Sequence, residues 1–152
     1  MATCLADTNL LLRLADPASV QHFAATTALA ELFRRSDEVF LTAQNLIEFW
    51  AVATRPVEVN GFGWTSQRTA REVAELRARF PVLPDSPAVF ERWLGLVEQL
   101  PIQGKRVHDA RLVAVMLVHG VEHLITFNLS DFSTFPKLSL IDPASLGRQR
   151  PQ

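Results

Sequence analysis

Two carboxylates follow apolar runs that have the length of β-strands. Asp7 comes directly after Cys4-Leu5-Ala6, and Asp131 comes shortly after the run 123–127. Parallel strands place their carboxyl ends at one edge of a sheet, which is where open α/β folds bind their ligands. Carboxylates at such an edge could hold a cation or take part in acid-base chemistry. Considered alone, however, Asp7 is more typical of a residue that caps the next helix.

Two further acids lie on predicted helices. Asp109 stands one turn before Leu112 and Val113, so its carboxylate lies on an apolar stripe. Partial burial of a carboxylate is costly unless another group compensates its charge. A favourable interaction with the helix dipole is the alternative to a functional site. Glu48 lies on the polar face of its helix, a pattern typical of a solvated surface acid, although a polar face can also line a cleft.

The elements that must position these acids alternate along the chain. Strands are predicted over residues 4–6, 39–41, 80–83, 123–127 and 138–141, and helices over residues 10–14, 20–35, 43–55, 67–78, 87–97 and 107–119. Such alternation favours a mostly parallel sheet with helices on both faces. If the first three strands wind one way and the last two the other, the first and fourth strands are neighbours. Asp7 then faces the loop that contains Asn128 and Asp131, at the topological switch point.

The helices after the second strand and before the fourth would bring Glu48 and Asp109 to the rim of the same crevice. Four carboxylates in one cleft repel one another. Such a cluster persists at neutral pH only if protons or cations compensate the charge. Oxygen ligands without Cys or His favour a hard cation, so Mg²⁺ or Mn²⁺ is expected rather than Zn²⁺.

Composition is consistent with one soluble domain. The chain has 152 residues, of which 48% are hydrophobic, and one cysteine, Cys4, which is expected to be a buried thiol in a reducing compartment. No signal peptide or membrane span is recognisable, and the predicted location is the cytoplasm. The 15 basic and 16 acidic residues give a net charge of −1, so any nucleic-acid contact must be local.

Four motifs in order resemble one family. They are Asp7-Thr8-Asn9, Glu48 in a helix that ends Ala-Thr-Arg-Pro, Val107-His108-Asp109-Ala110, and the segment 126–132 with the sequence Thr-Phe-Asn-Leu-Ser-Asp-Phe. This order resembles the PIN-domain ribonucleases, in particular the VapC-type toxins of toxin-antitoxin pairs. The resemblance implies a single three-layer α/β/α domain over residues 1–147, with a mostly parallel sheet of four to five strands and a loose tail at 148–152. It also implies an RNA substrate, homodimerisation and inhibition by a small cognate antitoxin.

The resemblance assigns roles residue by residue. The catalytic residues and metal ligands would be Asp7, Glu48, Asp109 and Asp131, supported by Thr8 and Asn128. The implied reaction is Mg²⁺-dependent hydrolysis of RNA phosphodiester bonds by a metal-activated water, with Mn²⁺ as a possible substitute. Candidates for RNA backbone contact are Lys105, Arg106 and the arginines between 68 and 79. At helical spacing, Trp50 and Trp93 are expected in the core rather than as base-stacking platforms.

Rival interpretations are less consistent with the sequence. A phosphoaspartyl phosphatase requires a second Asp two residues after the first, where this chain has Asn9. A receiver domain requires a Lys after its last strand, whereas Lys137 precedes the last predicted strand of this chain. A third alternative is a PIN-like scaffold that only binds RNA or a partner, and the complete acidic quartet argues against it.

Overall fold

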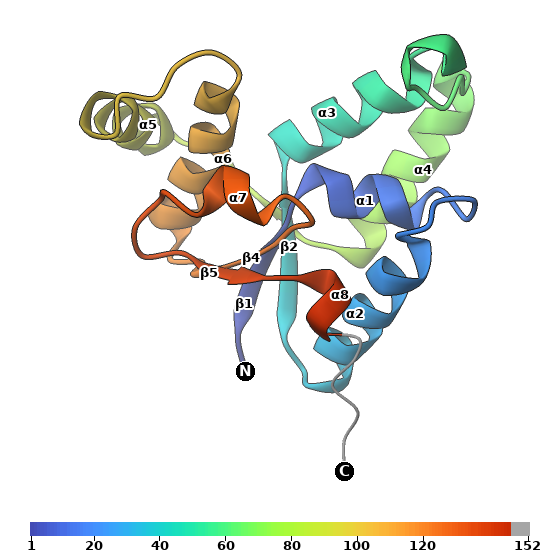
Figure 1. Ribbon diagram of the computed structural model, residues 1–152, viewed down its shortest axis with the longest axis horizontal. Coiled ribbons are helices and arrows are strands. Elements are labelled where there is room, and N and C mark those ends of the chain that lie inside the picture. The colour runs from blue at the N-terminus through green and yellow to red at the C-terminus, as the bar shows by residue number, and fades with distance from the viewer. Residues whose placement is uncertain (147–152) are drawn as a thin grey trace.

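A five-stranded parallel sheet forms the centre of the computed structural model, which describes residues 1–146 (Figure 1). The strand order is β3-β2-β1-β4-β5, with every neighbouring pair parallel. The strands are β1 (Thr3–Ala6), β2 (Glu38–Thr42), β3 (Val82–Leu83), β4 (His123–Ile125) and β5 (Ser139–Ile141). The predicted fold class is therefore confirmed, as is the pairing of the first strand with the fourth.

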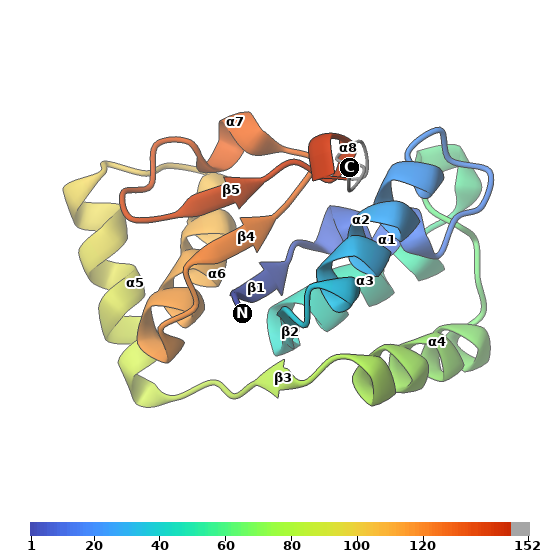
Figure 2. The same cartoon turned by 90° about the horizontal axis from the view of Figure 1, so that it is seen from below.

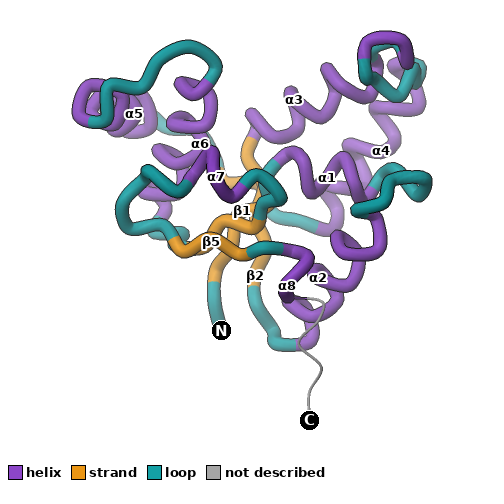
Figure 3. Tube along the Cα trace, in the orientation of Figure 1, coloured by secondary structure: helices purple, strands orange, loops and turns teal. Residues whose placement is uncertain are grey.

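Helices connect the strands and cover both faces of the sheet (Figures 2 and 3). In chain order the helical elements are α1 (Thr8–Leu14), α2 (His22–Arg34), α3 (Ala43–Thr54), the 3₁₀ turn η1 (Val57–Val59), α4 (Ser66–Arg79), α5 (Pro87–Gln99), α6 (Arg106–His119), α7 (Leu129–Phe132) and α8 (Pro143–Leu146). Helices α5 and α6 pack together on one face, whereas α1 to α4 and α8 contribute to the other.

Strand β1 separates two hydrophobic cores. Because successive side chains of a strand point to opposite faces, Cys4 and Ala6 join the core beneath α1, α2 and α3, whereas Leu5 joins the core beneath α5 and α6. All three side chains are fully buried, and burial raises the pKa of the Cys4 thiol to about 11. The buried thiol predicted at this position is confirmed.

Helix α6 explains the almost uniformly apolar sequence from Val107 onward. Its residues from Leu112 to Met116 are buried, because one side faces the sheet and another faces α5. Gly120 ends the helix in the left-handed conformation, with φ of 70°. Packing within one chain therefore accounts for this apolar surface, and α6 gives no evidence for a dimer.

Several boundaries differ from those predicted. Strand β4 ends at Ile125, two residues early, and β3 is reduced to Val82–Leu83 at the sheet edge. Helices α7 and α8 were not predicted, since four residues are too few for a helical periodicity to be recognised. Trp50 is 37% exposed, so its predicted place in the core is wrong. The predicted tail, 148–152, lies outside the described residues.

Within residues 1–146, every helix is too short or too polar to cross a bilayer.

Candidate active site

Asp7 is fixed at the carboxyl end of β1 by three donors. The Thr8 amide donates to Oδ1 at 2.8 Å, and the Thr126 hydroxyl and the Asn9 side-chain amide donate to Oδ2 at 2.8 and 3.1 Å. Asp7 is only 7% exposed and is the N-cap of α1. The capping role and the site role that the sequence offered as alternatives are thus compatible. Burial raises the pKa of Asp7, the bonds from Thr126 and Thr8 act against this rise, and the charge of Asp131 adds to it.

Thr126 and Asn9 join the ends of β1 and β4. Ala6 pairs with Ile125 at the ends of these strands. The residues that follow, Asp7 and Thr126, therefore meet at the sheet edge. The Thr126 hydroxyl accepts bonds from Asn9 Nδ2 at 3.1 Å and from the Asn128 amide at 2.9 Å, and Asn9 Oδ1 accepts from the Phe127 amide at 3.2 Å. Sequence reasoning assigned neither Thr126 nor Asn9 a role. The register of β1 against β4 is the signal that could have found them.

Asn45 connects Thr8 to helix α3. Its Nδ2 donates to the Thr8 hydroxyl at 3.1 Å, while its Oδ1 accepts from the Thr42 amide at 2.8 Å. The Thr42 hydroxyl in turn accepts from the Asn45 amide at 3.1 Å, which completes a capping box. Asn45 is fully buried and was missed by sequence reasoning, although Thr-x-x-Asn after an apolar strand is the signal for such a cap. This network sets the orientation of α3, and therefore of Glu48 one turn further along.

Glu48 is half-buried, so its interpretation as a solvated surface acid is wrong. Its Oε1 is buried and has no hydrogen-bond partner among the described residues. Burial raises the pKa of Glu48; the polar groups of Gln44 and Thr8 and the charge of His108 act against the rise, whereas the charge of Asp7 adds to it. A buried carboxylate oxygen without a partner is costly, which is a reason to expect a ligand there.

Asp109 lies in the first turn of α6. Burial raises its pKa to about 6, and the charges of Asp7, Asp131 and Glu48 add to the rise, while Arg106 acts against it. Asp131 is exposed on α7, yet its charge affects both Asp7 and Asp109. The structure thus brings the four predicted acids within electrostatic range of one another, because the charges of the other three all act on Asp109.

We tested whether this acidic quartet fits a metal ion. Within residues 1–146, no three His, Cys, Asp or Glu side chains are close enough together to hold one ion directly. Mg²⁺, however, usually keeps several waters and needs only one or two carboxylates. The oxygen-only donor set and the unpartnered Glu48 Oε1 therefore fit a hydrated hard cation.

The predicted basic contacts separate into two groups. Lys105 and Arg106 lie at the start of α6 beside the acids, and Arg106 donates to the Thr134 hydroxyl at 2.8 Å and to the Asp131 carbonyl at 3.4 Å. The arginines between 68 and 79 lie on α4, on the other side of α3 from α6 (Figures 1 and 2). Only the first group borders the quartet. Asn128 is exposed, and only its backbone amide bonds to Thr126.

Comparison with known proteins agrees with this architecture. The PIN domain family model matches residues 4–138. Ribonuclease VapC24 of Mycobacterium tuberculosis is 30% identical over 142 residues, which are 90% of this chain and 94% of the relative. Among solved structures, VapBC-1 of nontypeable Haemophilus influenzae has a TM-score of 0.70 at 18% identity, covering 93% of this chain and 98% of that chain. VapC20 of Mycobacterium tuberculosis, a sarcin-ricin loop cleaving toxin, has a TM-score of 0.58 at 18% identity, covering 89% and 98%.

The PIN domain family model covers most of the chain, and the similarity to VapC24 extends over nearly the full length of both proteins. The chain belongs to the PIN-domain family and, within it, to the VapC-type ribonucleases.

Proposed function

We propose that this protein is a Mg²⁺-dependent endoribonuclease that acts as the toxin of a toxin-antitoxin pair. The observation that carries the proposal is the acidic quartet at the β1–β4 switch point. There, Asp7, Asp109 and Glu48 all have raised pKa values and mutually unfavourable charges. Such repulsion is expected where a protein keeps carboxylates together for a cation.

The four acids are proposed to hold the ion with different degrees of freedom. Asp7 is fixed by three donors and defines the position of the site, while Asp109 is the second direct ligand. Asp131 contributes directly or through water, and Glu48 binds a second ion or orients the attacking water. When bound, Mg²⁺ would lower the pKa of a water and neutralise charge on the phosphoryl oxygens. Mn²⁺ is a possible substitute.

Positive charge beside the quartet would bind the RNA backbone. Lys105 is exposed, and Arg106 reaches the α7 segment that carries Asp131. A phosphate chain lying along the start of α6 would therefore pass next to Asp109. We propose no catalytic role for the arginines of α4, a helix on the other side of α3 from α6 (Figure 2).

A protein partner is proposed to cover the apolar surface between α3 and α4. Leu46, Ile47, Trp50, Ala51 and Val73 line a shallow cavity of about 450 Å³, and Ile47 is 69% exposed. A cognate antitoxin that covers this surface would lie beside the helix that carries Glu48. We further propose a cytoplasmic location and a homodimer, and the domain limits of 1–147 remain a prediction.

The test is cleavage of total bacterial RNA by the purified protein without antitoxin. Reactions contain Mg²⁺ or EDTA, and the variants are Asp7→Ala, Asp109→Asn and the control Glu98→Gln, which removes an exposed acid on α5. We expect discrete fragments with Mg²⁺ from the wild type and from Glu98→Gln only. Mapping the fragment ends names the RNA that is cut.

Two results would contradict the proposal. Cleavage that persists in EDTA, or in both quartet variants, would show that the acids are not the site. Intact RNA with folded, Mg²⁺-loaded protein that still binds RNA would instead favour a binding scaffold.

A further inference from the structure

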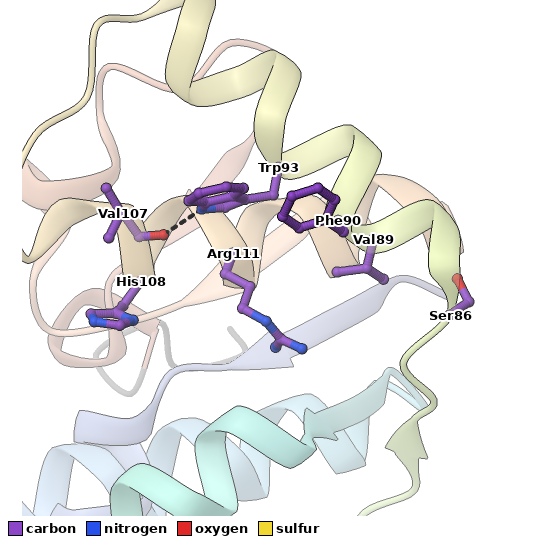
Figure 4. Close-up of a pocket in the computed structure, with 7 residues that line it drawn as sticks. All are labelled: Ser86, Val89, Phe90, Trp93, Val107, His108 and Arg111. Carbon is purple, nitrogen blue, oxygen red and sulfur yellow. Dashed lines mark hydrogen bonds between the residues drawn. The ribbon is translucent and has the colours of Figure 1, made fainter.

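An aromatic pocket opens between α5 and the start of α6 (Figure 4). Its volume is about 340 Å³, which is at the lower end of the range for small-ligand pockets. The lining residues are Ser86, Val89, Phe90, Trp93, Val107, His108 and Arg111. The pocket is too small for a helix of a partner protein, but its volume suits a single ring system.

The apolar wall of this pocket presents an aromatic face to solvent. Phe90 is 58% exposed, although large apolar side chains are usually buried, and its ring centroid lies 5.6 Å from that of Trp93. Trp93 donates its indole N–H to the Val107 carbonyl at 2.8 Å, which fixes the ring and satisfies its polar atom. What remains for a ligand is an apolar, aromatic stacking surface.

The opposite wall supplies polar groups. His108 is exposed, and Arg111 donates to Asp85 Oδ1 at 3.1 Å and to Gln44 Oε1 at 3.2 Å. The side chains of Asp85 and Arg111 are 44% and 37% exposed, and exposed ion pairs of this kind are weak. Arg111 can therefore exchange Asp85 for an acceptor on a ligand.

The polar wall also connects the pocket to the proposed active site. His108 directly precedes Asp109, and the Gln44 side chain donates to the His108 carbonyl at 2.8 Å. Gln44 stands one turn before Glu48 on α3. A chain whose phosphate lies at the quartet would thus place a neighbouring nucleotide at the mouth of the pocket.

We propose that this pocket binds an unpaired nucleobase next to the phosphate that is cleaved. The base stacks on Phe90, and its hydrogen-bonding edge faces His108 and Arg111. Single-stranded RNA is read in this way by proteins that hold splayed bases against aromatic rings. The inference rests on the proposed ribonuclease function, and it identifies the pocket as the determinant of base preference at one position.

The test measures binding separately from cleavage. In the Asp109→Asn background, fluorescent single-stranded oligoribonucleotides of A, C or U are titrated with Phe90→Ala and with the matched control Phe23→Ala. Phe23 is 76% exposed and lies on α2, away from α5 (Figure 2). Loss of one base-stacking contact should weaken binding roughly five- to 150-fold for Phe90→Ala. Phe23→Ala should bind the oligoribonucleotides with the same affinity as the Asp109→Asn parent. Phe90→Leu should recover only the part of the affinity that comes from apolar contact.

Quenching of 2-aminopurine fluorescence at the nucleotide beside the cleaved phosphate should disappear in Phe90→Ala. Equal affinities for the two alanine variants would overturn the inference while the RNA cleavage assay leaves the proposed function intact. A changed oligomeric mass of Phe90→Ala, with unchanged RNA affinity, would also overturn it and identify an interface between copies. Phe90-dependent binding in a protein that cuts no RNA would support the pocket and contradict the nuclease.

Discussion

Asp109→Asn should stabilise the ion-free protein at neutral pH while it removes cleavage activity. The pKa of Asp109 rises from the ordinary 3.8 to about 6 on folding. The folded state therefore binds this proton more tightly than the unfolded state does. The free energy of unfolding must fall as the pH rises from about 4 to about 6, and the ionised carboxylate is destabilising above that range. An asparagine keeps the shape of the side chain without the charge.

The size of the effect follows from the pKa of Asp109. The difference between 3.8 and about 6 corresponds to an upper limit of about 3 kcal/mol. Because Asp109 is only half-buried, solvent screening reduces this, and about 1–1.5 kcal/mol is a reasonable expectation. For a domain of this size the midpoint temperature should rise by roughly 2–6 °C.

Thermal unfolding in EDTA measures the effect directly. The wild type, Asp109→Asn and the exposed-acid control Glu98→Gln are compared near pH 7.5 and near pH 4.5. The midpoint temperature of Asp109→Asn should exceed that of the wild type at the higher pH, and this increase should shrink at the lower pH. Glu98→Gln should show no increase at either pH. Added Mg²⁺ should raise the midpoint of the wild type more than that of Asp109→Asn. A midpoint for Asp109→Asn at or below that of the wild type in EDTA at pH 7.5 would refute the electrostatic reasoning.

Three further predictions concern two residues beside the site and one glycine in the loop after η1. Thr126→Val removes a donor to Asp7 and should lower kcat roughly ten- to 100-fold with an unchanged fold by circular dichroism; full activity would show that the bond is dispensable. Asn45→Ala leaves buried partners unpaired and should lower the free energy of unfolding in urea by about 1–3 kcal/mol, and a smaller loss would mean that water replaces the amide. Gly61→Ala should lower the midpoint temperature, because the new Cβ would lie 2.0 Å from the Arg55 carbonyl oxygen; an unchanged midpoint would show that this loop moves without cost.

The sequence was sufficient to predict the sheet, and the family resemblance supplied the four candidate acids. Apolar runs that end in Asp7 and shortly before Asp131, separated by helical periodicities, leave few topologies because parallel crossovers are right-handed and short. The β1–β4 neighbourhood needed the further assumption that the chain reverses its winding after the third strand, which the observed strand order confirms. This neighbourhood places Asp7 beside the end of β4. The roles of the acids remain a proposal.

Residues whose roles depend on tertiary contacts could not be predicted. A helical projection places Glu48 on a polar face, but it cannot say that the start of α6 lies opposite and shields that face from water. The role of Thr126 needs the register of two strands separated by more than a hundred residues in sequence, which periodicity does not contain. Phe90 fits an apolar helix stripe equally well whether it is buried or lines a pocket.

The four acids differ in how firmly hydrogen bonds hold their side chains. This difference explains why acids that repel one another form no three-ligand cluster within residues 1–146. Asp7 accepts three hydrogen bonds, so its oxygens have little freedom. No described group donates to the side chains of Asp109 or Asp131, and without an ion their charges favour separation. In the proposed metal site, rotation of these side chains toward Asp7 would become favourable only with a cation that neutralises the cleft. Asp7 would then define where the ion binds, and the less constrained Asp109 and Asp131 would adjust to the phosphate.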